Sequence, residues 1–486
     1  MSFLKIGSER LKNFTRVHWH WLVLGAVLCA VVIWSSGTLL TKPKLWIDEA
    51  MTINTARSFM THGVLSPETA PNTFFQFPHL VQSTGYPLTL TLAGFFKVFG
   101  YGFYQARILM LLWIVAALSL VFFLAKKLFS REQACWSLLL ISSFASFYAN
   151  GRTAVGEIPG FAFLLAGFYF MLVRRRYFWA GIFWGLSVVT KPSVFGLVIP
   201  AIFLTFLLER SGFFRKIVPL ALGMMPAAVV WILLLVPRPF NGETWLSIAH
   251  FYKNPYSSSI AGNVIRNLSG VFHSTTLIYF GLFFLLVLGA RLLLKETRLS
   301  SLYTFTLVYS LLAFVYYLRS PGWLRYILIA ELLILFILPP VIGALTAYAK
   351  ERLKKVSMNA NTFANFILGF LVIVQIAQMF TIAKIFAGDN ALRTAVYLEK
   401  NFPDSAIGLL NAPELAILLN PSRVFLAVYL TGLPIIGENP LLLSKPPAVI
   451  VSPTGNPFAA EGRKILYERY GSSSVAGGYG IYKRSR

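Results

Sequence analysis

Apolar segments about as long as a bilayer is thick recur along the first four fifths of the chain. A helix needs about 20 apolar residues to cross the hydrocarbon core of a bilayer. The segments lie at 22–40, 106–125, 133–149, 157–173, 177–190, 193–208, 217–236, 275–294, 300–318, 326–349 and 363–386. Of the 486 residues, 57% are hydrophobic and only 13% are charged, whereas soluble domains average about 25% charged residues. We therefore predict an all-α polytopic membrane protein with about eleven spans, with twelve or thirteen as the alternative.

Lysine and arginine residues stand in short clusters between these segments, at 5–16, 126–131, 174–176, 210–216, 291–298 and 350–355. Because positive clusters stay on the cytoplasmic side, they place the N-terminus inside. Residues 21–40 are too long for the core of a signal peptide and read as an uncleaved first span. The formal net charge of +25 thus indicates topology, since the clusters form no continuous basic face for nucleic acid.

The apolar segment at 86–99 is too short for a span. Counting it as a span would also move every later positive cluster to the outer side of the membrane, against the positive-inside rule. We interpret it as a juxtamembrane or re-entrant element. The predicted outer face then holds 41–106, 150–157, the surroundings of Lys191, 237–274, 319–325 and everything after 386.

The composition changes after residue 387, where Asp, Asn, Gly and Pro punctuate a mixed pattern. Helical stretches at 391–400 and 460–470 alternate with β-like runs at 406–410, 448–451 and 478–482. We predict a transmembrane domain at 1–386, with 41–106 as its first outer loop, and a small soluble α/β domain at 387–486 on the extracytoplasmic side.

Asp48 and Glu49 adjoin the outer end of the first span, among aromatic and apolar neighbours. Such surroundings raise a carboxyl pKa and suit a general base. The alternative is that Asp48 is the N-cap of an amphipathic helix that runs through residues 56–60, a common role for aspartate. The spacing alone leaves both interpretations open.

A second acidic site lies in the segment 150–159, where Arg152 and Glu157 stand at the outer ends of two spans. Ionisable residues at a membrane boundary are often only topology anchors. Glu157 adjoins an apolar run, where a charge is costly, so we favour a functional role.

Lys191 lies on the predicted outer side, where the positive-inside rule would not place it. This exception indicates an anionic partner, and a phosphate is the natural candidate. Arg319 and Arg325 add guanidinium donors on the same face. The alternative is an interfacial belt of cations that contacts lipid head groups.

His250 lies in the long outer loop at 237–274 and is the remaining candidate for a substrate contact. A lone loop histidine is usually only polar surface. The other histidines show no ligand spacing typical of zinc, and no P-loop or dinucleotide fingerprint is present, so we predict neither a metal nor a nucleotide cofactor.

These motifs together resemble those of the C-type (GT-C fold) glycosyltransferases that use polyprenyl phosphates. The similarity is greatest to the superfamily of lipid A aminoarabinose transferases and protein mannosyltransferases. That family has a tryptophan shortly before an Asp-Glu pair in its first outer loop, as at Trp46 and 48–49 here. A Gly-Tyr element follows, resembled by residues 85–87, and then an arginine before the next span, here Arg107.

The resemblance implies roles for single residues. It makes Asp48 the catalytic base and Glu157 the second acidic residue of the site. It makes Lys191 part of a Thr-Lys-Gly-like motif in which Pro192 replaces the glycine. The substrate contacts that we predict are Glu49, Tyr86, Arg107, Arg152, Lys191, His250, Arg325 and Tyr326. Where some relatives carry a lysine before the Gly-Tyr element, this chain has Gln-Ser-Thr at 82–84, so contacts to the donor phosphate are expected to differ.

The resemblance implies an inverting transfer of sugar from a polyprenyl-phosphate donor to a glycolipid, a protein or a cell-envelope glycan. The enzyme would be an integral protein of the inner or plasma membrane and would act at its outer face. The main rival is a transporter or flippase for a lipid-linked glycan, which predicts charges near the midplane and paired interrupted helices. The candidate charges lie instead at the ends of spans.

Overall fold

The computed structural model describes residues 2–75, 84–209, 212–235, 242, 246, 259–293, 300–352, 359–385, 387–430, 433–437, 439–454 and 460–485. Eight stretches of helix in this part of the chain are long and apolar enough to cross a membrane. They lie in α1 (Ser2–Ser36), α5 (Phe103–Leu128), α10 and α11 (Pro192–Phe195 and Val198–Glu209), α12 (Phe213–Leu235), α15 (Thr275–Leu293), α16 (Ser300–Arg319), α17 (Leu328–Arg352) and α18 (Ala360–Ile385). The protein is therefore a multi-pass integral membrane protein.

The other three predicted spans are shorter or interrupted. The span at 157–173 is α8 (Glu157–Phe168) continued by the π-helical turn η1 (Tyr169–Val173), and the next is α9 (Tyr177–Thr190). The predicted span at 133–149 consists of two helices, α6 (Arg131–Ser142) and α7 (Ala145–Gly151), separated by a short break. The number of eleven spans therefore stays a prediction.

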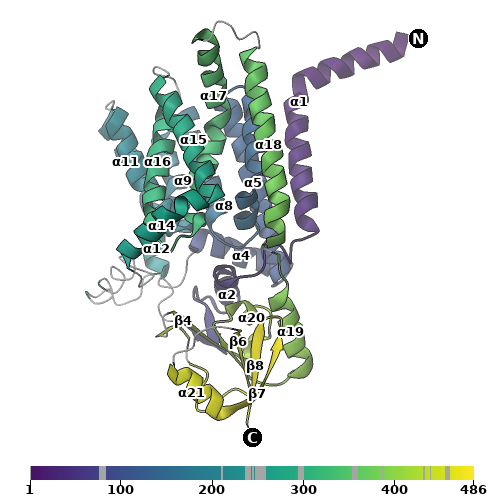
Figure 1. Ribbon diagram of the computed structural model, residues 1–486, viewed down its shortest axis with the longest axis vertical. Helices are drawn as coiled ribbons and strands as arrows, with labels where there is room; N and C mark the ends of the chain where they lie inside the picture. Colours follow the sequence, from purple (N-terminus) through teal and green to yellow (C-terminus); the bar gives the residue numbers. More distant parts are fainter. Residues whose placement is uncertain are drawn as a thin grey trace.

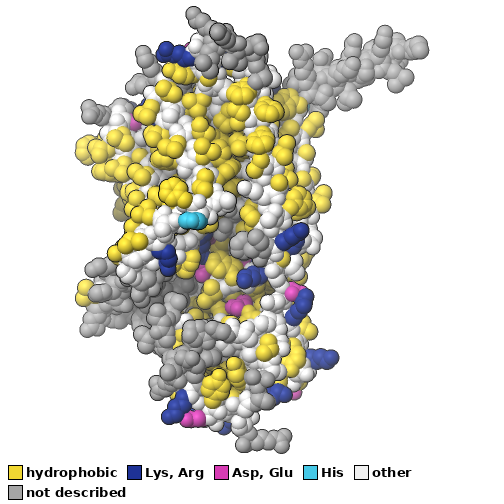
Figure 2. Space-filling view, viewed as in Figure 1, with side chains coloured by type: hydrophobic (Ala, Val, Ile, Leu, Met, Phe, Trp, Pro, Cys, Tyr) yellow, Lys and Arg dark blue, Asp and Glu magenta, His cyan; other side chains and the backbone are white. Residues whose placement is uncertain are grey.

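The helix α17 is the centre of the bundle. It packs against α6, α15, α16 and α18. Of the residues in its most apolar stretch, 83% are buried inside the protein. Figure 1 shows the long helices side by side, with the C-terminal strands beyond one end of the bundle. The space-filling view shows hydrophobic side chains over the helices, and acidic and basic side chains gathered where the bundle gives way to the C-terminal region (Figure 2).

Two short helices lie between the bundle and the C-terminal strands (Figure 1). These are α2 (Ile47–His62) and α4 (Tyr86–Phe99), which pack against each other. The small antiparallel pair β1 (Glu68–Ala70) and β2 (Thr73–Phe74) follows α2. The 14 residues of α4 span only about 21 Å at 1.5 Å per residue, which agrees with a juxtamembrane element.

The C-terminal region carries a six-stranded mixed sheet in the order β5-β4-β3-β6-β8-β7. Its strands are β3 (Ile407–Leu410), β4 (Val424–Leu430), β5 (Leu433–Ile436), β6 (Val449–Pro453), β7 (Tyr470–Ala476) and β8 (Tyr479–Arg484). The central strand β3 is parallel to β4 and β6, with Gly408 opposite Phe425 and Ile450, and the outer pairs are antiparallel. Its helices are α19 (Asn390–Asn401), α20 (Pro413–Ala416) and α21 (Ala460–Arg469). The predicted fold class, a helical membrane protein with a small α/β region at its C-terminal end, is confirmed.

Candidate active site

The acidic pair lies in the first turn of α2. Trp46 precedes the helix in an extended conformation (φ −145°, ψ 169°), and its side chain makes no capping hydrogen bond. Asp48 and Glu49 follow inside the first turn, where negative charge interacts favourably with the helix dipole. The N-cap interpretation of Asp48 is therefore wrong, because Trp46 holds that position.

The two carboxylates of the pair point in different directions, since successive helical residues are rotated by about 100°. Glu49 is fully buried. It accepts hydrogen bonds from Arg107 Nε (2.5 Å) and Nη2 (2.6 Å), and from the backbone N–H of Ala154 (3.1 Å). Asp48 keeps 18% of its side chain exposed. Of the two carboxylates, only that of Asp48 is thus partly accessible from outside the protein.

Arg107 lies near the start of α5 and is fully buried. Besides Glu49, it binds the carbonyl oxygens of Leu39 (3.0 Å) and Pro43 (3.1 Å) in the loop 37–46 that joins α1 to α2. We predicted Glu49 and Arg107 as substrate contacts. The structure places both in a bidentate ion pair that ties three parts of the chain together, so they position the loop that leads into α2 and Asp48.

Asp48 lies within a group of four charged side chains from distant parts of the chain, which we call the charged cluster. It consists of Asp48, Glu157, Lys191 and Arg325. Arg325 Nη1 lies 2.5 Å from Asp48 Oδ2. Lys191 Nζ lies 3.9 Å from Asp48 Oδ2 and 3.7 Å from Glu157 Oε1. The cluster therefore combines two carboxylates and two cations at the end of the bundle that faces the C-terminal strands.

Lys191 occupies the junction between α9 and α10, where two glycines permit an unusually close approach of other backbone segments. A Cβ on Gly85 would lie 1.7 Å from the carbonyl oxygen of Val189, and one on Gly156 would lie 2.5 Å from that of Thr190. The Gly85 N–H donates to Thr190 O (2.8 Å). Pro192 then begins α10, a position that suits proline because its missing N–H is not needed there.

A Gly85→Ala substitution should lower the thermal stability of the protein, because the new methyl group collides with the backbone beside Lys191. Overpacking of this kind costs about 1–3 kcal/mol. Gly94 lies inside α4, the helix that Gly85 precedes, and has open space around its Cβ position, so Gly94→Ala should be neutral or stabilising. The measurement is thermal unfolding of both variants in detergent. Equal melting temperatures would contradict the close approach.

Three aromatic rings surround the guanidinium of Arg325, at centroid distances of 5.0 Å for Trp46, 4.6 Å for Trp323 and 5.6 Å for Tyr326. Arg325 and Tyr326 belong to the short 3-10 helix η3 (Leu324–Tyr326) that precedes α17. Cation–π contacts of this kind hold an arginine without consuming its hydrogen-bond donors. Arg325 is thereby oriented toward Asp48 and keeps donors for a ligand.

The charged cluster is incompletely satisfied within the described part of the chain. Lys191 is 1% exposed and Glu157 is fully buried, yet neither Lys191 Nζ nor either carboxylate oxygen of Glu157 has a hydrogen-bond partner among the described residues. Burial lowers the pKa of Lys191, and the carboxylates of Glu157 and Asp48 oppose this effect. Buried polar groups without partners are rare in folded proteins and mark ligand or solvent sites.

The other predicted site residues fall in different places. The Tyr86 hydroxyl donates to Ala227 O (3.3 Å), and its ring packs beside Val189. Tyr326 is buried beside Arg325. Arg152 donates to Thr38 Oγ1 (2.9 Å) and lines a separate cavity. His250 lies outside the described residues. These predicted roles stay predictions.

One buried network was not singled out from the sequence. Arg57 of α2 pairs with Glu68 (3.2 Å) and donates to Ala416 O (3.3 Å) of the C-terminal region. The Tyr101 hydroxyl donates to the next carbonyl, that of Ile417 (2.8 Å). The signal in the sequence for this network was Arg57 itself, an arginine with apolar neighbours in the middle of a helix. The network joins the first loop to the C-terminal region.

Comparison with known proteins agrees with this architecture. The family model described as dolichyl-phosphate-mannose-protein mannosyltransferase matches residues 87–236, about a third of the chain. This stretch contains Glu157 and Lys191. A search of curated protein sequences found no match.

Two solved structures are similar over nearly the whole chain. One is ArnT from Cupriavidus metallidurans bound to undecaprenyl phosphate, with 12% identity, a TM-score of 0.62, and coverage of 96% of this chain and 97% of that one. The other is the archaeal oligosaccharyltransferase AglB from Archaeoglobus fulgidus, in complex with an inhibitory peptide and a dolichol-phosphate. It has 12% identity, a TM-score of 0.56, and coverage of 97% and 75%.

The protein therefore has the GT-C fold, and the family-model match and this fold together class it as a membrane glycosyltransferase. The resemblance seen in the sequence motifs is confirmed at this level. Within the class, its architecture is similar to that of ArnT from one end of the chain to the other.

Proposed function

We propose that the protein transfers a sugar from a polyprenyl-phosphate donor to a nucleophile on a glycolipid, a protein or a cell-envelope glycan. The observation that carries this proposal is the charged cluster. In it, a partly exposed carboxylate lies within 4 Å of two cations, and one of the cations is almost fully buried. The two solved relatives were captured with undecaprenyl phosphate and dolichol-phosphate, which supports this class of donor.

Lys191 and Arg325 are the proposed contacts for the donor phosphate. Lysine acts as a point charge and arginine as a two-pronged donor for phosphate oxygens. With no donor bound, Arg325 pairs with Asp48 at 2.5 Å. A donor phosphate competes for the same guanidinium, and its arrival releases Asp48 for the acceptor. Glu157 holds Lys191 near Asp48 throughout.

The proposed reaction is a single inverting displacement at the anomeric carbon. The acceptor nucleophile forms a bond to that carbon while the bond from carbon to phosphate oxygen breaks, and its electron pair leaves on the phosphate. Asp48 accepts the proton that the nucleophile loses. Lys191 and Arg325 stabilise the negative charge that develops on the departing phosphate.

We place this site at the outer face of the membrane. The helix α5 begins near Glu49 and ends at Lys126 and Lys127, and α17 begins after Arg325 and ends at Lys350 and Arg352. Both helices thus run from the site toward a positive cluster. Because positive clusters stay in the cytoplasm, the opposite end, which holds the charged cluster, faces outward.

The direct test uses the full chain reconstituted in liposomes with radiolabelled undecaprenyl-phosphate-linked sugars and an envelope extract as the source of acceptors. We expect label to move from the donor to a lipid or protein of the extract. Transport of the labelled donor across the bilayer without transfer would instead support a flippase. Failure of every donor to bind would contradict the assigned phosphate site.

The affinity for the donor should weaken at alkaline pH. Because the pKa of Lys191 is lowered by burial, its ammonium is present below that pKa and is lost as the pH rises through it. The KM for donor should therefore rise on the alkaline side. In the double variant Lys191→Met/Glu157→Gln, which leaves no unpaired buried carboxylate, KM should be high and insensitive over the same pH range. If KM changed with pH in the same way in the wild type and in the double variant, a group other than Lys191 would cause the pH dependence.

A further inference from the structure

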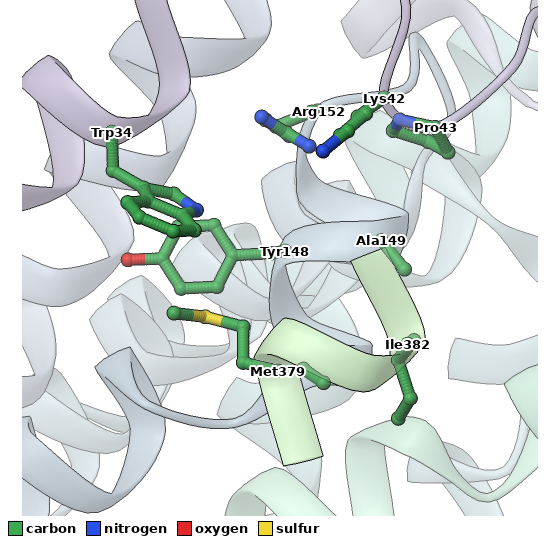
Figure 3. Close-up of a pocket in the computed structure, with 9 residues that line it drawn as sticks. Trp34, Lys42, Pro43, Tyr148, Ala149, Arg152, Met379 and Ile382 are labelled. Atoms are coloured by element: carbon green, nitrogen blue, oxygen red, sulfur yellow. The ribbon is translucent and has the colours of Figure 1, made fainter. Parts of the chain in front are cut away.

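A second, separate cavity lies between the ends of α1 and α18, beside α7. It is partly open to the surroundings, and its lining includes Trp34, Lys42, Tyr148, Arg152 and Met379. Figure 3 shows the charged ends of Lys42 and Arg152 turned toward one another at one side of the cavity. Two like charges arranged in this way repel each other unless an anion lies between them.

Arg152 is only 5% exposed, and its Nε has no hydrogen-bond partner among the described residues. Burial, and then the charge of Arg107, lower its pKa to about 10, so the guanidinium is still charged at neutral pH. The charge of Arg107 is balanced by Glu49. Within the described part of the chain, no carboxylate pairs with Arg152 or Lys42. The cavity therefore has an unbalanced positive charge.

The opposite walls of this cavity are apolar and belong to membrane helices. Trp34 lies at the end of one candidate span, and Met379 and Ile382 lie at the end of another. Trp34 is 42% exposed, as expected for an aromatic residue at the level of the lipid head groups. A ligand that matches both the cationic and the apolar side of the cavity has an anionic head group beside Arg152. Its hydrocarbon chain extends out of the cavity between α1 and α18.

We propose that this cavity binds the phosphate group of a membrane lipid, between Lys42 and Arg152, with the lipid chains against α1 and α18. The site is distinct from the charged cluster and does not depend on the proposed transfer reaction. The phosphate can belong to a bulk phospholipid or to a polyprenyl phosphate, and the two sources are separable by experiment.

A lipid held here is connected to Asp48 through the protein. Arg152 donates to Thr38 Oγ1 (2.9 Å), and the neighbouring Arg107 binds Leu39 O and Pro43 O. All three acceptors belong to the loop 37–46, which leads into the first turn of α2. A bound lipid phosphate therefore fixes Arg152, and with it the loop that positions the acidic pair.

The test is native mass spectrometry of the delipidated full-length protein, titrated separately with dioleoyl phosphatidylglycerol and with undecaprenyl phosphate. The variants are Lys42→Gln and Arg152→Gln. Lys44→Gln, which removes the same charge from an exposed lysine two residues away, is the matched control. Loss of one cation near a lipid phosphate is worth about fivefold in affinity. We expect that loss for at least one of the two lipids in Lys42→Gln and not in Lys44→Gln.

The second site is distinguished from the charged cluster by Lys191→Met. Retained phosphatidylglycerol binding in this variant, together with loss in Lys42→Gln, assigns the cavity to a phospholipid. The same pattern with undecaprenyl phosphate alone assigns it to the prenyl lipid. Thermal unfolding identifies any variant that fails to fold, and Lys42→Gln decides the matter if Arg152→Gln does not fold. Equal affinities of wild type and Lys42→Gln for both lipids would overturn the proposal.

Discussion

An Asp48→Asn variant should transfer sugar about 10²- to 10⁴-fold more slowly than the wild type, the range over which general-base catalysis contributes. Asparagine keeps the shape of the side chain and an oxygen that can accept from Arg325, which donates to Asp48 at 2.5 Å. It cannot accept a proton from the acceptor. We therefore expect kcat to fall while the variant folds and still binds donor. The measurement is initial rates of transfer from a labelled polyprenyl-phosphate sugar.

A matched control for this variant is Asp389→Asn, which makes the same chemical change at an aspartate of the C-terminal region. Asp389 pairs with the exposed Arg393 (2.8 Å) four residues later, and such a surface pair contributes little. Its transfer rate should equal that of the wild type. Full activity in Asp48→Asn and also in Glu157→Gln would show that the cluster does not carry the chemistry.

An Arg107→Met variant should be the least stable of the single substitutions considered. It leaves Glu49 fully buried without its bidentate partner, and breaking a buried ion pair in this way costs about 3–5 kcal/mol. Thermal unfolding in detergent should show a large decrease in melting temperature and a low yield. A double variant, Glu49→Leu/Arg107→Met, removes both charges and should recover much of the loss.

The matched control for the ion pair is the exposed pair of Lys464 and Glu468, whose atoms are 3.9 Å apart. Glu468→Gln should change stability by less than about 1 kcal/mol. If Arg107→Met were as stable as Glu468→Gln, the buried pair would not hold the loop 37–46 in place. In that case the position of Asp48 would not depend on a loop that the ion pair holds in place.

The long spans were predictable from the sequence because an apolar run of span length has few alternatives to crossing a bilayer. Positions such as 106–125 and 326–349 coincide with α5 and α17. The span predicted at 133–149 is divided where α6 ends, and at this point the Ser143 hydroxyl lies 2.7 Å from Gln375 Oε1. Hydropathy alone does not contain this information, since the partner glutamine is 232 residues away.

The sequence indicated which charged residues belong to the cluster, but it did not indicate which carboxylate pairs with which cation. Asp48, Glu157, Lys191 and Arg325 each stood out as a charge at the end of a span, and the structure brings them together. Which carboxylate meets which cation depends on helix rotation and on close backbone contacts. The choice of Arg107 for Glu49 and of Arg325 for Asp48 follows from these contacts. For this reason the burial of Glu49 against Arg107 could not be read from the sequence.

The shortness of α8 with η1 and of α9 has a consequence for the depth of the chemistry in the membrane. Both begin or end at the charged cluster, and their other ends meet in the arginine turn at 174–176. Their 17 and 14 residues measure about 26 and 21 Å, against a hydrocarbon thickness of about 30 Å. With that turn at one membrane surface, Glu157 and Lys191 lie about 4–9 Å short of the other. A donor phosphate that contacts them would then lie below the bilayer interface, or the bilayer would thin around the enzyme.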